Sequence, residues 1–408
     1  MKRLLFILII FFIGMTAFGQ DMSFYSQEYM RAGTTFTERL VILETIRDSG
    51  ITATGEFYHS ALRYLLSRSP DISNVADRTA AERSAVILVQ GLAALRYQEA
   101  AWDVWQTSEL FDVFGGNVTD GSAQQAALIA LGQIGNKVVL SNLVQRLDEF
   151  NSQVVRNPDQ RRRVNTAVIG FVSAFEAFGE AAGYRPVFFA SVGPYDPPIR
   201  EIAANALPNI VDDPSDVLVA MIRDPRSDPP TKLLIWREMG RTNMPNASKA
   251  KVAAAALDIG WLFQTTNRTF QTSLRELRKA AIDVIRQFGA TDDSVYANLD
   301  RSYRNNFIAN TPDYDEIRMA IGALTAINND QSVGILYRFL NEINTRRRVG
   351  PWGNKERLSY EWIVSGLGAT RSQLGEVRLL LTTISRNSIY TAQEREMAAN
   401  ALRAITGN

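Results

Sequence analysis

The residue types that most often perform chemistry are scarce in this chain of 408 residues. It contains no cysteine, and its one histidine is His59. These two facts exclude thiolate nucleophiles and multi-histidine metal sites. To act as a general base, His59 would need an orienting acid and a nucleophile, and no Gly-x-Ser-x-Gly elbow or phosphate loop accompanies it. We therefore predict no catalytic, metal or cofactor site.

The strongest candidate for binding is a short segment rich in arginine, which we expect between two helices. Its candidate contact residues are Arg346, Arg347, Arg348, Trp352 and Lys355. Arginine and tryptophan are enriched at the energetic centres of protein interfaces. We predict that these five residues form a contact patch. The alternative is that the arginines complement a helix C-terminus and that the tryptophan packs on the next helix.

Six other arginines recur at one position of a repeated pattern: Arg161, Arg200, Arg278, Arg318, Arg357 and Arg395. Equal spacing would stack them as a ladder along the molecule. We favour a structural ladder, in which each arginine binds a carboxylate of a neighbouring turn or helix start. The candidate carboxylates are Asp159, Asp196, Glu276 and Asp315. The alternative is a basic strip for an acidic partner.

Each of these arginines begins an apolar pattern. Apolar residues follow at positions +3, +6, +7 and +10, which lie on one face of an α-helix; only the copy at Arg318 slips after its first half. The copy that begins at Arg200 continues with Ala203, Ala206, Leu207 and Ile210. Other copies begin at Gln124, Arg83 and Arg39. The period of about 39 residues leaves room for two helices and two turns.

Glycines mark the expected ends of several of these helices: Gly135, Gly179, Gly240, Gly289 and Gly368. Glycine is favoured there because it adopts the left-handed cap conformation without strain. Segments that combine Asp or Asn with Pro, as in Asn157-Pro158 and Pro312-Asp313, precede expected helix starts.

The segments Ile199–Leu207 and Glu316–Leu324 resemble the second helix of HEAT repeats, and Ala127–Gly135 resembles the bacterial lyase-type variant. The resemblance extends over residues 35–408, with an irregular copy near 232–240. It implies an armadillo-like, all-α fold: a right-handed α-α superhelix, or solenoid, of about nine to ten helix pairs that holds other macromolecules. We expect one solenoid over residues 20–408, in which the weakly matching residues 20–80 form an N-terminal cap.

The first nineteen residues differ from the rest. Lys2 and Arg3 precede the apolar run Leu4–Ile13, and Ala17-Phe18-Gly19 follows with small residues. This order predicts a cleaved secretory signal peptide over residues 1–19. The apolar stretch is shorter than the roughly twenty residues that span a bilayer, although an uncleaved anchor is an alternative. No later segment is apolar enough to span a membrane. We expect a bacterial protein in the periplasm or outside the cell.

The charge of the chain bears on its partners. The formal net charge is +1, and removal of Lys2 and Arg3 makes it −1. A nearly neutral chain has no global electrostatic attraction for nucleic acid or anionic lipid. We predict an exported, non-catalytic scaffold that binds a protein or another envelope macromolecule. The alternatives are a structural component of an envelope assembly and an all-α enzyme acting on envelope glycans or peptides. The oligomeric state is left open.

Overall fold

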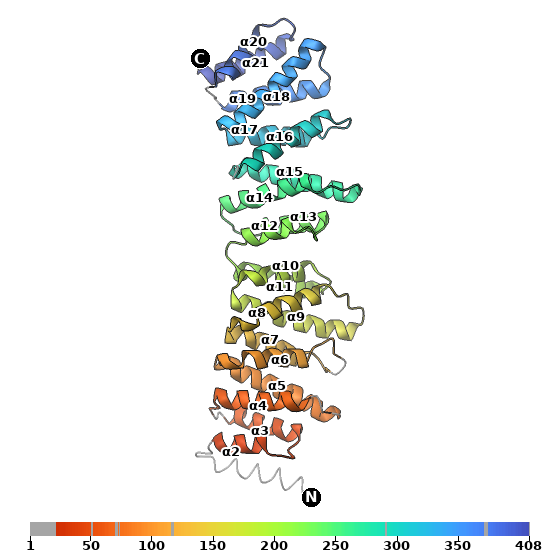
Figure 1. Cartoon of the computed structure of the whole chain (residues 1–408), viewed down its shortest axis with the longest axis vertical. Helices are drawn as coiled ribbons and strands as arrows, with labels where there is room; N and C mark the ends of the chain where they lie inside the picture. Colours follow the sequence, from red (N-terminus) through yellow and green to blue (C-terminus); the bar gives the residue numbers. More distant parts are fainter. Residues whose placement is uncertain are drawn as a thin grey trace. The chain divides into compact units, whose positions relative to one another are not determined.

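The computed structural model describes residues 22–49, 52–69, 72, 74–115, 118–289, 292–370 and 374–407 (Figure 1). These residues form twenty α-helices, α2 to α21, with three short 3₁₀ segments, and this part of the chain contains no strand. The prediction of an all-α fold built from helix pairs is confirmed. The predicted signal peptide, residues 1–19, lies outside the described residues.

The helices belong to two compact units, which divide between Val211 and Asp212. The first unit contains α2 (Met22–Met30), α3 (Phe36–Asp48), α4 (Gly55–Arg68), α5 (Val75–Ala94), α6 (Ala101–Leu110), α7 (Ser122–Ile134), α8 (Leu140–Asn151), α9 (Pro158–Phe178), α10 (Tyr184–Val192) and α11 (Pro197–Ile210). The second contains α12 (Ser215–Arg223), α13 (Pro229–Met239), α14 (Asn246–Leu262), α15 (Arg268–Phe288), α16 (Asp293–Ile308), α17 (Tyr314–Ile327), α18 (Asp330–Val349), α19 (Asn354–Thr370), α20 (Gly375–Arg386) and α21 (Ala392–Thr406).

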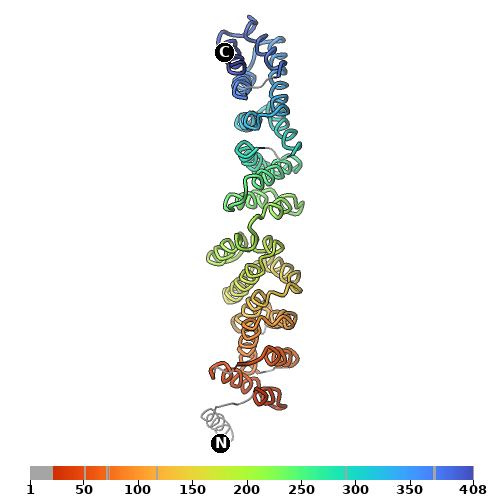
Figure 2. The backbone as a smooth tube through the Cα atoms, turned by 90° about the vertical axis from the view of Figure 1, so that its left-hand side faces the viewer, coloured from red at the N-terminus to blue at the C-terminus, as the bar shows by residue number. Residues whose placement is uncertain are grey.

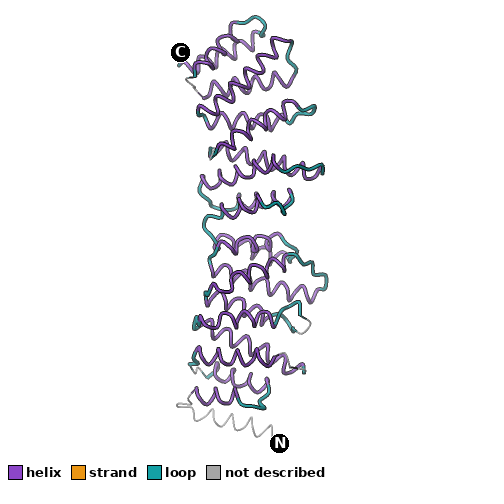
Figure 3. Tube along the Cα trace, in the orientation of Figure 1, coloured by secondary structure: helices purple, strands orange, loops and turns teal. Residues whose placement is uncertain are grey.

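Within each unit the helices form two layers. Odd-numbered helices pack on the next odd-numbered helix, from α3 to α11 in the first unit and from α13 to α21 in the second. Most even-numbered helices pack on the next even-numbered helix in the same way. Figure 2 shows the helices of each unit turned by 90° from Figure 1. Short loops join the helices, as Figure 3 shows in teal. Each helix therefore buries its apolar face against sequence neighbours, which is the packing of an α-solenoid.

The repeated sequence pattern corresponds to the odd layer. Its starting residues lie in α3 (Arg39), α5 (Arg83), α7 (Gln124), α9 (Arg161), α11 (Arg200), α15 (Arg278), α17 (Arg318), α19 (Arg357) and α21 (Arg395). The apolar followers form the core: Tyr360, Ile363, Val364 and Leu367 of α19 are at most 1% exposed. Burial of such side chains stabilises each layer by about 1.5–3 kcal/mol per large apolar residue.

Two glycines show how the sequence signal was ambiguous. Gly135 ends α7 in the left-handed conformation, with φ 76°, as predicted. Gly368, also predicted at a helix end, lies inside α19, and a Cβ there would be 3.1 Å from Cα of Ala401 in α21. The prediction for Gly368 was wrong because this glycine permits close helix packing.

Candidate functional site

The predicted arginine-rich loop is largely helical. Helix α18 continues to Val349, so Arg346, Arg347 and Arg348 form its last turn. Lys355 lies in the first turn of α19, and only residues 350–353 form the connection. Cationic side chains are favourable at a helix C-terminus because they face the negative end of the helix dipole. This arrangement matches the structural alternative for the arginines.

Trp352 does not present its ring to a partner, so its assignment to the contact patch is corrected. The residue is 7% exposed, and its indole Nε1 donates a hydrogen bond of 3.2 Å to the carbonyl oxygen of Ile343. Its ring centroid lies 4.9 Å from that of Tyr360 and 5.4 Å from that of Tyr390. A large aromatic ring between two helices is removed from water and stabilises the packing.

Arg347 also has a structural environment. Its Nε donates a hydrogen bond of 3.1 Å to the carbonyl oxygen of Ile389, and its Nη2 lies 3.7 Å from Glu394 Oε2. The side chains of Arg347 and Glu394 are only 15% and 10% exposed. Arg347 therefore connects α18 to the start of α21.

The surface of this region consists of Arg346, Arg348, Val349 and Lys355, which we name the cationic corner. Nη2 of Arg346 lies 3.3 Å from Oε1 of Glu342. The guanidinium of Arg346 lies 4.8 Å from the ring centroid of Phe307, and the ammonium of Lys355 lies 5.4 Å from the same centroid. Val349 is 89% exposed. Within the described residues, Arg348 forms no ion pair, so its charge is available at the surface. A binding role of the corner stays a prediction.

The six recurring arginines do not form a continuous ladder. Arg278 makes a bidentate pair with Glu316 of the next odd helix, with distances of 2.8 and 3.0 Å. The predicted partner Glu276 is two residues away on the same helix, and such neighbours point in different directions. Arg161 lies 3.4 Å from Asp196 at the start of the next odd-numbered helix, although this candidate carboxylate is closer in sequence to Arg200.

The other four arginines differ. Arg318 pairs with Asp315 of its own helix at 3.3 Å, and Arg395 donates to the carbonyl oxygen of Tyr390 at 2.9 Å. Arg200 and Arg357 make no side-chain ion pair within the described residues. Other side chains also connect successive odd helices or the turns that precede them, among them Thr37–Asp77, Glu82–Thr119, Asn165–Asp196 and Lys279–Asp313.

His59 has the orienting acid that sequence analysis did not find. Its Nε2 lies 2.6 Å from Oδ2 of Asp103, and this contact joins α4 to α6. The two side chains are 15% and 18% exposed. Among the described residues, Asp103 is the one hydrogen-bond partner of the imidazole, and these residues contain no group of three or more potential metal ligands. The pair connects neighbouring even helices.

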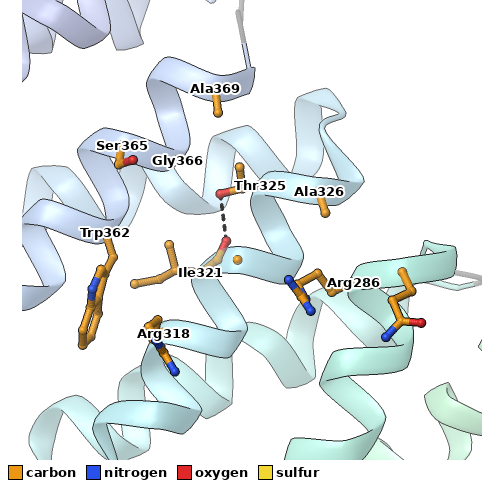
Figure 4. Close-up of a pocket in the computed structure, with 11 residues that line it drawn as sticks. Arg286, Arg318, Ile321, Thr325, Ala326, Trp362, Ser365, Gly366 and Ala369 are labelled. Atoms are coloured by element: carbon orange, nitrogen blue, oxygen red, sulfur yellow. Dashed lines mark hydrogen bonds between the residues drawn. The ribbon is translucent and has the colours of Figure 1, made fainter.

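A groove over α17 is the feature that sequence analysis missed (Figure 4). It has a volume of about 520 Å³ and lies within the second unit. Its lining comes from three successive odd helices: Arg286 and Gln287 of α15, Arg318, Ile321, Gly322, Thr325 and Ala326 of α17, and Trp362, Ser365, Gly366 and Ala369 of α19. We name it the α17 groove.

Small residues hollow out the α17 groove. A Cβ at Gly366 would lie 2.4 Å from Oγ1 of Thr325, so this glycine permits close packing of α17 and α19. Gly322 differs, because the nearest atom to a Cβ there would be Cδ of Arg286 at 3.7 Å. A side chain at position 322 would therefore occupy the groove itself.

The polar groups of the groove are mainly donors. Arg286 and Arg318 pair with Asp283 and Asp315 at 2.7 and 3.3 Å, each within its own helix. The hydroxyl of Thr325 donates to the carbonyl oxygen of Ile321, as the dashed line in Figure 4 shows. Within the described residues, the indole N–H of Trp362 and the hydroxyl of Ser365 have no hydrogen-bond partner. Both groups can donate to a bound molecule.

Comparison with known proteins gives no family assignment. No family model matches the chain, and no curated protein matches it either. Among the described helices, none combines the length and apolar character that crossing a bilayer requires.

Proposed function

We propose that this protein is an exported, non-catalytic scaffold that holds a protein partner on its odd-numbered helices. In this proposal it is a HEAT-like solenoid of the bacterial periplasm or cell exterior. The α17 groove is the observation that carries the proposal. It is a hollow of the size that protein sites use for ligands, and its lining combines an aromatic ring with hydrogen-bond donors.

The arrangement of the groove supports a binding function. Its lining residues lie on three helices that are fixed by buried neighbours, among them Leu324 and Ile363, both at 0% exposure. Rigid elements hold a contact surface at little conformational cost when a partner binds. The cationic corner, at the end of α18 and the start of α19, offers a second contact region of the same unit.

Site-specific photo-crosslinking in cells of the native species tests the proposal. A photoreactive amino acid would replace Ser365 in the groove, Val349 in the cationic corner, or Arg338 on the exposed face of α18 as the control. A scaffold gives a discrete heavier product at Ser365 or Val349 that contains a second protein, and none at Arg338. A product that contains only this chain would favour a self-associating envelope component. The absence of any product at Ser365 and Val349 would overturn the proposal.

A further inference from the structure

We infer that the α17 groove binds an extended, acidic peptide segment of a partner protein. This inference rests on the proposed scaffold function and specifies the chemistry of the partner. It depends on the charges, the free donors and the shape of the groove.

The charges of the groove favour carboxylates. Both arginines that line it, Arg286 and Arg318, have acidic partners only on their own helices, and these pairs are solvent-exposed. The exposed fractions of the two arginine side chains are 53% and 62%. Exposed pairs of this kind contribute little to stability, so a ligand carboxylate can replace Asp283 or Asp315 at little cost. A guanidinium also binds a carboxylate in a bidentate geometry that a simple cation cannot offer.

The uncharged groups require a ligand that supplies acceptors. Trp362 Nε1 and Ser365 Oγ have hydrogens to donate and no partner within the described residues, and no carboxylate lines the groove. An extended peptide presents backbone carbonyl oxygens along its whole length, whereas a helical peptide has already used most of its own. Donors along the groove therefore match an extended chain better than a helix.

The shape of the groove has the same implication. Gly322, Ala326, Gly366 and Ala369 have no side chain or only a methyl group, so a peptide backbone can approach the helices closely. The indole of Trp362 forms one wall beside Ile321, as Figure 4 shows, and can cover one apolar side chain of the ligand. Lysine and arginine also outnumber aspartate and glutamate in residues 212–408, which favours an acidic partner for this unit.

A second hollow, over α8 in the first unit, is less suited to a ligand. Its volume is about 910 Å³, but its carboxylates are engaged within the protein. Asp148 accepts from Arg185 at 2.9 Å, and Glu149 from Arg146 at 2.6 Å. It has no aromatic wall, so the α17 groove is the better-supported site.

Peptide display on the full chain tests the inference. A library of random ten-residue peptides would be selected against the purified protein, and the enriched peptides would be synthesised with a fluorescent label for anisotropy titration. We expect enriched peptides to contain at least two acidic residues and an apolar residue. Binding should weaken as salt rises, because charge pairs at a surface are screened.

Two variants locate the binding. Gly322→Leu fills the groove and excludes the peptide from it. Arg286→Glu/Arg318→Glu reverses the charge of the groove and removes charge-assisted hydrogen bonds. Each change should weaken binding by at least about tenfold. The matched controls are Gly334→Leu, at a helical glycine with no atom within 4 Å of a Cβ, and Arg338→Glu on α18. Both controls should bind like the native protein, and circular dichroism would verify that every variant is folded.

Three results would overturn the inference: no enriched peptide, enriched peptides without acidic residues, or equal binding by the native protein and folded Gly322→Leu. None of them would remove the scaffold function if photo-crosslinking at Val349 or Ser365 still captured a partner. The two proposals can therefore fail separately.

Discussion

Arg278 of α15 and Glu316 of α17 form a buried, bidentate ion pair between successive helix pairs. Nε lies 2.8 Å from Oε1 and Nη2 lies 3.0 Å from Oε2, and the glutamate side chain is 0% exposed. Arg278 also donates to the carbonyl oxygen of Gly260 at 3.0 Å, and its guanidinium lies 4.1 Å from the ring centroid of Trp261. The pair satisfies two charges that would otherwise be costly to bury.

We predict that Arg278→Met lowers the free energy of unfolding by about 3–5 kcal/mol, because it leaves the Glu316 carboxylate buried without a partner. Arg278→Met/Glu316→Leu should recover most of this loss. The control Arg318→Met, which removes an exposed pair, should change the value by less than about 0.5 kcal/mol. Urea unfolding followed by circular dichroism measures all three. Equal losses in the single and double variants would show that the pair does not couple the two helices.

Trp352→Ala should lower the free energy of unfolding by about 3–5 kcal/mol, since it leaves a cavity between Tyr360 and Tyr390. Trp352→Phe keeps part of the ring contact but loses the hydrogen bond to Ile343, so its loss should be smaller. Chemical denaturation of both variants provides the comparison. A loss below about 1 kcal/mol for Trp352→Ala would contradict the buried position of the indole.

Lys232 should make stability depend on pH. It is 1% exposed, and its ammonium donates to the carbonyl oxygens of Ile222 and Asp224 at 2.6 Å. Burial lowers the pKa of Lys232 below its usual 10.5, although Asp224 and Asp228 oppose the effect. Between the lowered pKa of the folded state and the value of about 10.5 in the unfolded state, the unfolded chain binds more protons.

The contribution of Lys232 to stability therefore rises with pH across that interval. The free energy of unfolding would be measured for the native protein and Lys232→Met from about pH 7 to about pH 10, a range that approaches the unfolded pKa of lysine. As the pH rises, the free energy of unfolding of the native protein should increase relative to that of Lys232→Met. If the free energy of unfolding of the native protein instead fell relative to that of Lys232→Met as the pH rose, a lowered pKa of Lys232 would be excluded as the cause.

Glycine substitutions should have opposite effects at two helical positions. A Cβ at Gly132 of α7 would lie 2.8 Å from Cα of Ala174 in α9, so Gly132→Ala should lower the free energy of unfolding by about 1–3 kcal/mol. Gly334→Ala, which meets no atom within 4 Å, should raise it by up to about 1 kcal/mol through helix propensity. Thermal unfolding of the two variants distinguishes these effects, and stabilisation by both would show that α7 and α9 are not in close contact.

The fold was predictable because its information is local and repeated. The copy at Arg357 places Tyr360, Ile363 and Val364 in the core with the spacing that a helix requires. The same spacing could not separate a capping glycine from a packing glycine, and Gly368 was therefore placed at a helix end. That distinction depends on Ala401, which lies in another helix.

The candidate site was less predictable because it depends on distant neighbours. Trp352 looked like a surface residue between glycines, but Tyr390 of the next repeat helps to cover it. The α17 groove combines Arg286, Arg318 and Trp362 from three helices at unequal spacings, so they occupy different positions of the repeat. Comparison of the sequence copies could not reveal that the three side chains surround one hollow.

The hydrogen bonds between helix pairs have one further consequence, which concerns the order of assembly. Among the described residues, the hydrogen bond from the hydroxyl of Tyr390 to Asn344 joins the two positions that are farthest apart in the sequence, and they are 46 residues apart. A chain that emerges from its N-terminus would complete each of these hydrogen bonds after fewer than fifty residues had followed. Successive pairs can then dock before the remainder of the chain has emerged, and only the contacts of the last pair, such as Tyr360 with Glu394, require the C-terminal residues.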